Sequence, residues 1–362
     1  MGFWENIDGA GSRINVYDQM KKSILPLYIY GAGNLAENIL KKLNEYGIKL
    51  EGCITDSGEE KFGNYKVYKY DDFINSREEN FCNLLIGFAS AYERKQILRK
   101  ERVFNQVFVI ANPFDHHVHF DYGFVKDHRE QLEEAYDLLA DKYSKQCFCA
   151  FINARIWENS DYVQKIFRGE IDEFNNDVIT TEADEVFLDV GAYNGGSIKR
   201  FLKSNNGRYK KIIGIEPEDI NFKNLEMFCY KNNICADLYK IGCWNKKDRL
   251  FFNGSDDKCC RLDKNGEDCI EVDTIDNIVS ADVEVSMFNL GISTAELEIL
   301  EGAQRTIEKN LPKILVFMGS AKEELYTIPQ YVKELNESYQ IYLRFIQAMP
   351  SRIFMYAVPV LK

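Results

Sequence analysis

The chain has 362 residues, a formal net charge of −12 at pH 7 and 28% charged residues. Because domains usually run to about 100–200 residues, this length predicts two domains and a connector. The acidic balance, without any Lys/Arg-rich run, argues against a nucleic-acid partner. Residues 1–18 lack the apolar core of a secretory signal, and no stretch approaches the ~20 apolar residues of a membrane-spanning helix. We therefore expect a cytoplasmic protein without a membrane partner.

The first region with a regular pattern combines short apolar strands with amphipathic helices. Strand candidates lie at residues 27–30, 50–55, 83–88 and 106–110. A helical pattern with Leu35, Ile39 and Leu43 on one face follows the first strand, and a charged helix separates the last two. This alternation predicts a parallel sheet, and we assign residues 1–112 to a small Rossmann-like domain.

A glycine-rich turn follows the first strand of this domain. Gly31 and Gly33, then Asn34, open the helix, and Asp56 ends the second strand. This order fits the dinucleotide fingerprint with alanine as its third small residue, which leaves a helix N-terminus open to phosphate. The segment resembles the Rossmann-like domains attached to sugar-modifying enzymes and bacterial sugar-nucleotide acyltransferases. The four residues therefore form a candidate nucleotide site, with a packing or dimerisation role as the equally weighted alternative.

Residues 113–180 differ from both flanking regions. They are rich in Tyr, Phe and charged residues, and helical patterns cover residues 129–143 and 161–167. We interpret this stretch as a helical connector.

Two groups of side chains suggest metal binding at first sight. His116, His117 and His119 are clustered, but neighbours at i and i+1 diverge on any regular element, so surface or interdomain histidines are the favoured interpretation. Cys147 with Cys149 does not have the spacing of a zinc site, nor do the adjacent Cys259 and Cys260. With no export signal, we expect reduced thiols and no bound metal.

Strand and helix patterns alternate again from Glu185 onward, and we assign residues 181–362 to a second domain. Strand candidates lie at residues 186–189, 211–215, 238–243, 283–290, 313–317, 340–346 and 353–358. Helix candidates run from residue 196 to 201 and over residues 220–231, 294–309 and 328–338. The pattern predicts an α/β fold with a second parallel sheet.

The first strand of this domain carries the more specific motif. It ends in Asp189, followed by Gly191 and Gly195 before a helix, and the second strand ends in Glu216. Glycines at such a turn let a ligand approach the backbone, and an acid ending the second strand can accept both hydroxyls of a ribose. An acid at the end of the first strand would repel a pyrophosphate but suits an ammonium and a sulfonium. The simpler alternative is that Asp189 only caps the following helix.

These segments resemble the FkbM-type family of S-adenosylmethionine-dependent O-methyltransferases. The resemblance rests on VFLDVGAYNGGS, on IIGIEPEDINFKNLE, and on residues 275–278 and 295–303, within about residues 183–358. It implies a class I methyltransferase fold and S-adenosylmethionine as cofactor. The implied cofactor-binding residues come from two turns: Asp189, Gly191, Ala192, Tyr193, Asn194, Gly195, Glu216 and Pro217.

The chain departs from the family pattern at the carboxyl ends of two later strands, where we expect the methyl acceptor to bind. The family's Lys-x-Asp-x-Glu-Gly element corresponds here to four uncharged residues, and its Tyr-His pair after the next strand is absent from residues 317–320. The four are Asn289, Gly291, Ser293 and Thr294. No general base can be named from the sequence. Glu296 is a candidate by location only, and an acid that favours a helix N-terminus is the preferred interpretation.

The sequence thus supports an enzyme that methylates an oxygen of a sugar, nucleotide sugar or related small molecule. The alternative is a catalytically lapsed protein that binds cofactor or nucleotide sugar for regulation or assembly. The sequence leaves homo-oligomer formation open.

Overall fold

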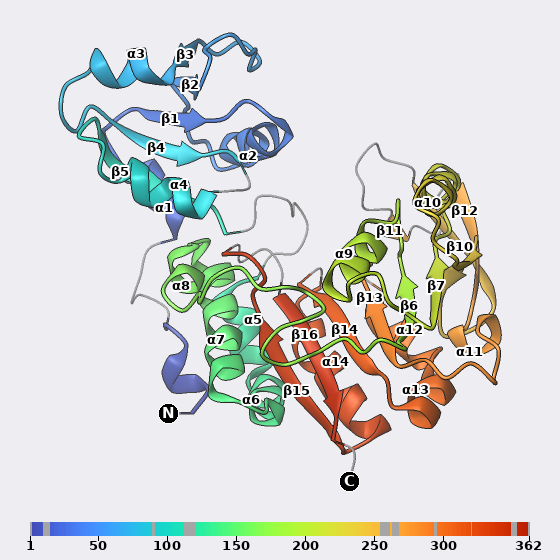
Figure 1. Cartoon of the computed structure of the whole chain (residues 1–362). Helices are drawn as coiled ribbons and strands as arrows, with labels where there is room; N and C mark the ends of the chain where they lie inside the picture. The colour runs from blue at the N-terminus through green and yellow to red at the C-terminus, as the bar shows by residue number, and fades with distance from the viewer. Residues whose placement is uncertain are drawn as a thin grey trace. The chain divides into compact units, whose positions relative to one another are not determined.

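The structure is a computed structural model and describes residues 2–9, 15–88, 91–111, 120–253, 261–262, 268–292, 295–319, 321–348 and 353–360. The chain divides into two compact units (Figure 1). Unit 1 comprises Met1–Arg129, Gln146–Gly169 and Gln347–Ser351, and unit 2 comprises Glu130–Lys145, Glu170–Ile346 and Arg352–Lys362.

Unit 1 contains a five-stranded sheet in which every paired strand is parallel to its neighbour. The strands are β1 (Leu27–Tyr30), β2 (Gly52–Thr55), β3 (Val67–Lys69), β4 (Cys82–Ile86) and β5 (Phe104–Phe108). Their order is β3-β2-β1-β4-β5, so the chain winds outward from β1 on one side and then crosses to β4 on the other. The expected parallel sheet is confirmed, although the sequence analysis did not anticipate β3.

Helices cover both faces of this sheet. They are α1 (Val16–Lys22), α2 (Asn34–Glu45), α3 (Tyr70–Asn75) and α4 (Ala91–Leu98). Successive residues of β1 point to opposite faces, so Ile29 packs with Ile39 of α2 while Tyr28 packs with Phe73 of α3. The strand is therefore apolar throughout, as expected for a strand buried on both sides.

Five further helices of the described chain belong wholly or partly to unit 1. They are η1 (Trp4–Asn6), α5 (Tyr122–Asp127) and α8 (Asp161–Gln164), with α7 (Lys142–Trp157) and α6 (Arg129–Leu138) contributing residues to both units. Lys95 of α4 is buried, and its Nζ lies 2.6 Å from Asp161 Oδ1 at the start of α8. The ion pair compensates the buried ammonium and anchors α8 to α4.

Unit 2 contains a seven-stranded sheet of order β15-β16-β14-β13-β6-β7-β8. The strands are β6 (Val186–Val190), β7 (Lys211–Ile215), β8 (Asp237–Tyr239), β13 (Met287–Leu290), β14 (Lys313–Met318), β15 (Tyr339–Arg344) and β16 (Ile353–Pro359). Strand β16 is antiparallel to both neighbours, and the remaining pairs are parallel. The winding reverses between β6 and β13, and ligands of open α/β sheets bind outside the carboxyl ends of strands at such a point.

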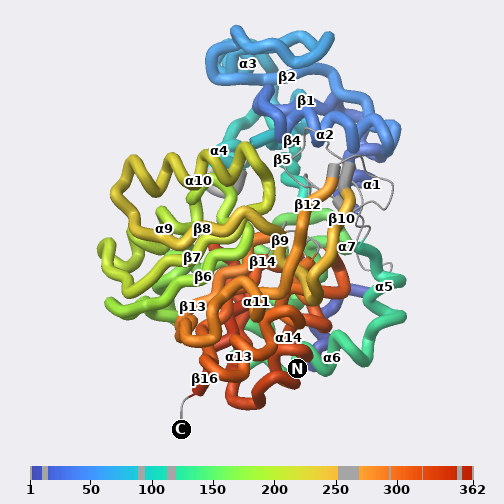
Figure 2. The backbone as a smooth tube through the Cα atoms, turned by 90° about the vertical axis from the view of Figure 1, so that its right-hand side faces the viewer, coloured from blue at the N-terminus to red at the C-terminus, as the bar shows by residue number. Residues whose placement is uncertain are grey.

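The helices of unit 2 are α9 (Gly196–Ser204), α10 (Asp219–Lys231), α11 (Ile275–Ile278), α12 (Glu296–Glu301), α13 (Gln304–Asn310) and α14 (Glu324–Leu335). Phe187 of β6 stacks on Phe201 of α9 with ring centroids 4.1 Å apart. A second sheet has the order β11-β10-β12-β9, and Figure 2 labels three of its strands, β9, β10 and β12. Its strands are β9 (Gly242–Cys243), β10 (Asp248–Asn253), β11 (Arg261–Leu262) and β12 (Asp268–Asp273).

Three expected elements of unit 2 differ from the structure. The single strand expected over residues 238–243 is wrong, because β8 ends at Tyr239 and β9 begins at Gly242 in the other sheet. The strand expected over residues 283–290 is limited to β13, and the single helix expected over residues 294–309 is wrong, because α12 ends before Gly302 and α13 begins at Gln304. A Cβ on Gly302 would lie 2.1 Å from the carbonyl oxygen of Trp244. The helix is interrupted where the backbone of another segment passes, and only glycine leaves it room.

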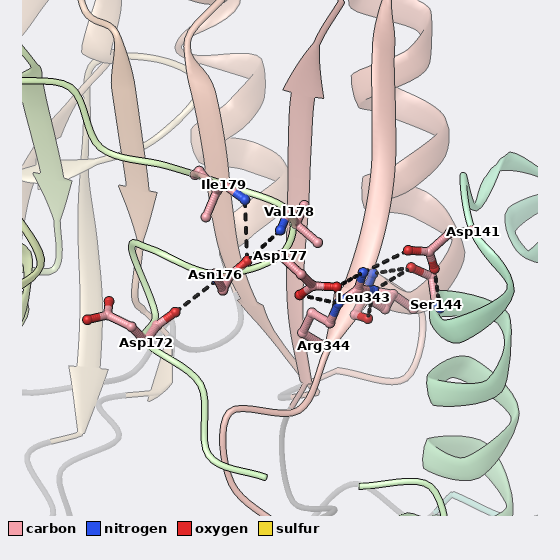
Figure 3. Close-up of polar contacts among 9 residues, drawn as sticks. All are labelled: Asp141, Ser144, Asp172, Asn176, Asp177, Val178, Ile179, Leu343 and Arg344. Carbon is pink, nitrogen blue, oxygen red and sulfur yellow. Dashed lines mark hydrogen bonds and ion pairs between the residues drawn. The ribbon is translucent and has the colours of Figure 1, made fainter. Parts of the chain in front are cut away.

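The segment that leads into β6 is held by a buried arginine (Figure 3). The guanidinium of Arg344 on β15 donates to both carboxylate oxygens of Asp177, to Asp141 Oδ2 at 2.7 Å and to Ser144 Oγ at 3.0 Å. One residue upstream, the Asn176 side-chain oxygen accepts backbone N–H bonds from residues 178 and 179. These bonds fix the position of the segment that enters β6.

We predict that Arg344→Met lowers the free energy of unfolding by about 2–4 kcal/mol, because it removes the buried guanidinium that donates to two carboxylates and to the Ser144 hydroxyl. Arg249→Met is the matched control, since Arg249 pairs with Glu271 on the surface with both side chains about 70% exposed. Urea unfolding monitored by circular dichroism checks this. Equal midpoints for the two variants would contradict it.

Candidate functional site

The carboxyl end of β6 holds a buried acid at the centre of unit 2. Asp189 is fully buried and accepts hydrogen bonds from the Ser197 hydroxyl and, at 2.8 Å, from the side-chain nitrogen of Asn289. Asn289 is its partner in the register between β6 and β13. Burial raises the pKa of Asp189 to about 6, and the two hydrogen bonds act in the opposite direction. Both partners are side chains, so Asp189 does more than cap α9.

Asn289 occupies the position that is lysine in the family pattern. Its amide satisfies one oxygen of Asp189 without adding a compensating positive charge. This neutral contact leaves the desolvation of the carboxylate uncompensated, which is the physical reason for the raised pKa of Asp189. Although Asn289 departs from the family pattern, its side chain still links β13 to β6 through this hydrogen bond.

The turn between β6 and α9 has a backbone that requires glycine. Gly191 has φ +77° and Gly195 has φ +87°, and a Cβ would lie 2.5 Å from Ile292 at the first and 2.3 Å from Phe228 at the second. Tyr193 also has a positive φ, +50°, although it is not glycine. Non-glycine residues adopt this conformation only where their surroundings hold them in it.

Glu216, which directly follows β7, holds that turn. Its Oε2 accepts the backbone N–H of Tyr193 at 2.9 Å and its Oε1 accepts that of Glu218 at 3.1 Å. Burial raises the pKa of Glu216, and the two backbone N–H bonds and the nearby Asn221 side chain lower it in part. Each carboxylate oxygen uses one lone pair in this way and keeps capacity for a further donor.

The structure brings the other predicted cofactor residues to the same turns. Ala192 is buried, Asn194 and Tyr193 are exposed beside the turn, and Pro217 is half-buried after Glu216. The eight predicted residues thus form two adjacent loops at the carboxyl ends of β6 and β7, which are neighbouring strands.

A second pair of acids follows β13 and β14. Glu296, the first residue of α12, is 1% exposed, and no N–H or O–H donates to its carboxylate in hydrogen-bonding geometry within the described part of the chain. Burial raises its pKa well above the usual value, and the neighbouring Glu324 raises it further. Glu296 lies in the first turn of α12, as expected of an acid that favours a helix N-terminus, and the backbone N–H groups of Ala295 and Glu296 lower its pKa in part. Ser293, Thr294 and Ser320 lie outside the described residues.

The predicted nucleotide residues of unit 1 also lie at the carboxyl edge of their sheet. Gly31 has φ +109°, Gly33 is the N-cap of α2 without a side-chain hydrogen bond, and Asn34 begins that helix. Asp56 is hydrogen-bonded by the hydroxyl of Tyr30, and the exposed Arg94 lies 3.5 Å from it.

The sequence did not predict four hydrogen-bonding or charged partners at these sites. They are Ser197, Arg94, Glu324 and Tyr30, whose hydroxyl donates to Asp56. Ser197 and Arg94 lie within helices, where a serine or arginine carries no pattern of its own. Glu324 belongs to a Lys-Glu-Glu run that is typical of a solvated helix start. No local signal could have identified these partners.

Most of the residues considered for metal binding lie outside the part of the chain that the structure describes. His116, His117 and His119, and Cys259 with Cys260, lie outside the described residues. Within the described ranges no three His, Cys, Asp or Glu side chains are grouped to hold a metal ion. In the same ranges no helix has the length and apolar character needed to cross a membrane.

Comparison with solved structures decides the fold. The methyltransferase FkbM from Methylobacillus flagellatus KT matches with a TM-score of 0.71 and 18% identity, over 95% of this chain and 93% of that one. Unit 2 has the class I methyltransferase fold. The likeness extends well beyond residues 183–358, on which the resemblance in sequence rested. No family model and no curated protein matches the chain.

Two further structures match only in part. A putative rRNA methylase from Clostridium thermocellum has a TM-score of 0.32 and 16% identity, over 51% of this chain and 90% of that one. An rRNA methylase from Streptococcus thermophilus has a TM-score of 0.32 and 14% identity, over 50% and 90%. Matches this distant carry no weight for the acceptor.

We predict that Gly195→Ala lowers the free energy of unfolding by about 2–4 kcal/mol, because it combines a left-handed φ with a clash against Phe228. The matched control is Gly207→Ala, which has φ +74° but open space around the new Cβ. It should cost only about 1 kcal/mol. Urea unfolding of both variants separates strain from clash, and similar costs would contradict the close packing of the turn.

The raised pKa of Asp189 predicts a pH-dependent stability. Since the folded state holds this proton up to a pH of about 6 and the unfolded state releases it near pH 4, the contribution of Asp189 is present at low pH and is lost as pH rises through 6. Between about pH 4.5 and pH 7.5 the loss is roughly 2 kcal/mol. Asp189→Asn should lack this loss when unfolding is measured at both pH values, and parallel pH profiles of the two proteins would refute the assignment.

Proposed function

We propose that unit 2 binds S-adenosylmethionine at the turns after β6 and β7 and transfers its methyl group to an oxygen of a sugar, nucleotide sugar or related small molecule. The observation that carries this proposal is the arrangement of Glu216. Its carboxylate is oriented by the N–H groups of Tyr193 and Glu218, with capacity left on both oxygens. Two adjacent acceptors in a fixed orientation suit the vicinal hydroxyls of a ribose.

The glycine turn fits the rest of the cofactor. The positive φ angles of Gly191 and Gly195 let the backbone turn tightly at the end of β6, and this turn lies at the edge where open sheets bind ligands. Asp189 lies beneath the turn, where its negative potential favours the ammonium and sulfonium. When bound, the cofactor supplies an electrophilic methyl group.

The acceptor is assigned by location and charge. Substrates of such a sheet bind beyond the carboxyl ends of the strands next to the cofactor, which here are β13 and β14. The net charge of −12 disfavours a nucleic-acid acceptor. The negative charge is compatible with a small hydroxylated acceptor.

One observation favours the alternative that the protein binds the cofactor but has lost catalytic activity. At the positions in and after β13 that are ionisable in the family pattern, Asn289 donates only an amide and Gly291 has no side chain. A protein of this kind would bind the cofactor without transferring its methyl group. Incubation with labelled S-adenosylmethionine and a panel of nucleotide sugars distinguishes the two, because persistent absence of transfer despite binding favours the lapsed protein.

We predict that Glu216→Gln weakens binding of S-adenosylhomocysteine by about 10- to 100-fold, since it removes charged hydrogen bonds to the ribose that contribute about 1.5–3 kcal/mol. Isothermal titration calorimetry on the full chain measures this. Glu226→Gln, an exposed substitution on α10, is the control and should bind as the unaltered protein does. Equal affinity of both variants, or no binding by the unaltered protein at millimolar ligand, would refute the cofactor site.

A further inference from the structure

The acids Glu296 and Glu324 form a buried pair where a methyl acceptor would lie. Glu296 begins α12, six residues after the end of β13, and Glu324 begins α14, six residues after the end of β14. The two strands are parallel neighbours, so both acids follow strand ends at the same edge of the sheet. Glu296 is 1% exposed and Glu324 is 5% exposed.

The two carboxyl groups differ in their hydrogen bonding. Glu324 accepts the backbone N–H of Gly319 at 2.8 Å and that of Ala321 at 2.9 Å, one on each oxygen. Such bonds favour the ionised form of a carboxyl group. Glu296 interacts electrostatically with Glu324 across the packed helices α12 and α14. The backbone N–H groups of Ala295 and Glu296 lie near its carboxylate, but no N–H or O–H among the described residues donates to it in good geometry.

Two acids in such contact share one proton, because both cannot stay charged in a desolvated site. Glu324 is the partner stabilised as an anion, so the proton resides on Glu296 and is directed at Glu324. This arrangement leaves Glu296 with an oxygen that accepts no well-aligned hydrogen bond from the described residues. A buried acceptor without a donor is costly unless a ligand supplies the donor.

We propose that Glu296 receives the acceptor hydroxyl and that the Glu296–Glu324 pair takes up its proton during methyl transfer. The proposal rests on the proposed function and supplies the proton acceptor that the sequence does not identify. The O–CH₃ bond forms as the S–CH₃ bond breaks. The hydroxyl proton passes to the free oxygen of Glu296, while the proton already on Glu296 passes to Glu324. The pair ends with two protons and no charge, and S-adenosylhomocysteine leaves as the neutral thioether.

The pair also defines the chemical class of the acceptor. A shared proton leaves the pair with one negative charge, which suits a hydroxyl donor better than an acidic group. Glu296 is the catalytic residue of this relay, and Glu324 is a positioning residue that acts through it.

Glutamine substitutions test the relay without removing the contact. In Glu296→Gln the amide N–H₂ can still donate to Glu324, so the fold is preserved while the transferable proton is lost. We expect kcat with labelled S-adenosylmethionine and hydroxylated acceptors such as UDP-glucose and GDP-mannose to fall about 100-fold or more. Affinity for S-adenosylhomocysteine and the thermal midpoint should stay unchanged. Glu324→Gln should lower kcat comparably, with partial recovery in Glu324→Asp.

Neighbouring acids on the same helices provide the controls. Glu298→Gln on α12 and Glu323→Gln before α14 should retain full transfer and stability, because both side chains are partly exposed. The inference is overturned if Glu296→Gln transfers as well as these controls, or if it lowers the thermal midpoint by several degrees, which would show a structural role. Binding of cofactor without transfer by the unaltered chain would instead overturn the proposed function.

Discussion

The arrangement of unit 2 depends on a single buried carboxyl group at the carboxyl end of β6. Asp189 has no access to solvent, so each of its oxygens needs a donor from the protein. Ser197 provides one from α9 and Asn289 provides the other from β13. The same side chain therefore joins the central strand to its neighbour and to the following helix, at the point where the winding of the sheet reverses. Substituting either partner would leave the acid only partly satisfied.

Around this acid, carboxylates hold the loops at the edge of the sheet by accepting pairs of backbone N–H groups. Glu216 does so for the turns after β6 and β7, Glu324 for the loop after β14, and Glu218 for the first turn of α10. Such bonds orient an acid and favour its ionised form without the need for a nearby cation. This explains how a chain with an excess of acidic residues can keep several of them at its candidate site.

The sequence predicted those parts of the site that are local in the chain. Asp189, the glycine turn and Glu216 lie within strand–turn and turn–helix patterns, so their chemistry could be inferred from spacing alone. The Glu296–Glu324 pair could not, because it joins residues 28 positions apart that each fit an ordinary helix start. The break at Gly302 was missed for a similar reason. It is imposed by the passing carbonyl of Trp244, whereas the local sequence is a continuous helical pattern.

The position of β16 has a consequence for the order in which unit 2 assembles. Strand β15 precedes β16 in the chain, yet it joins the large sheet only through β16, which lies between it and β14. The β15–β16 hairpin can form from local contacts, whereas its docking on β14 closes a longer loop through α14. Since Arg344 lies on β15, the bonds that hold the entry to β6 depend on residues that are far apart in the chain. The segment that enters β6, the first strand of this sheet in the chain, is thus held by β15, one of its last two strands.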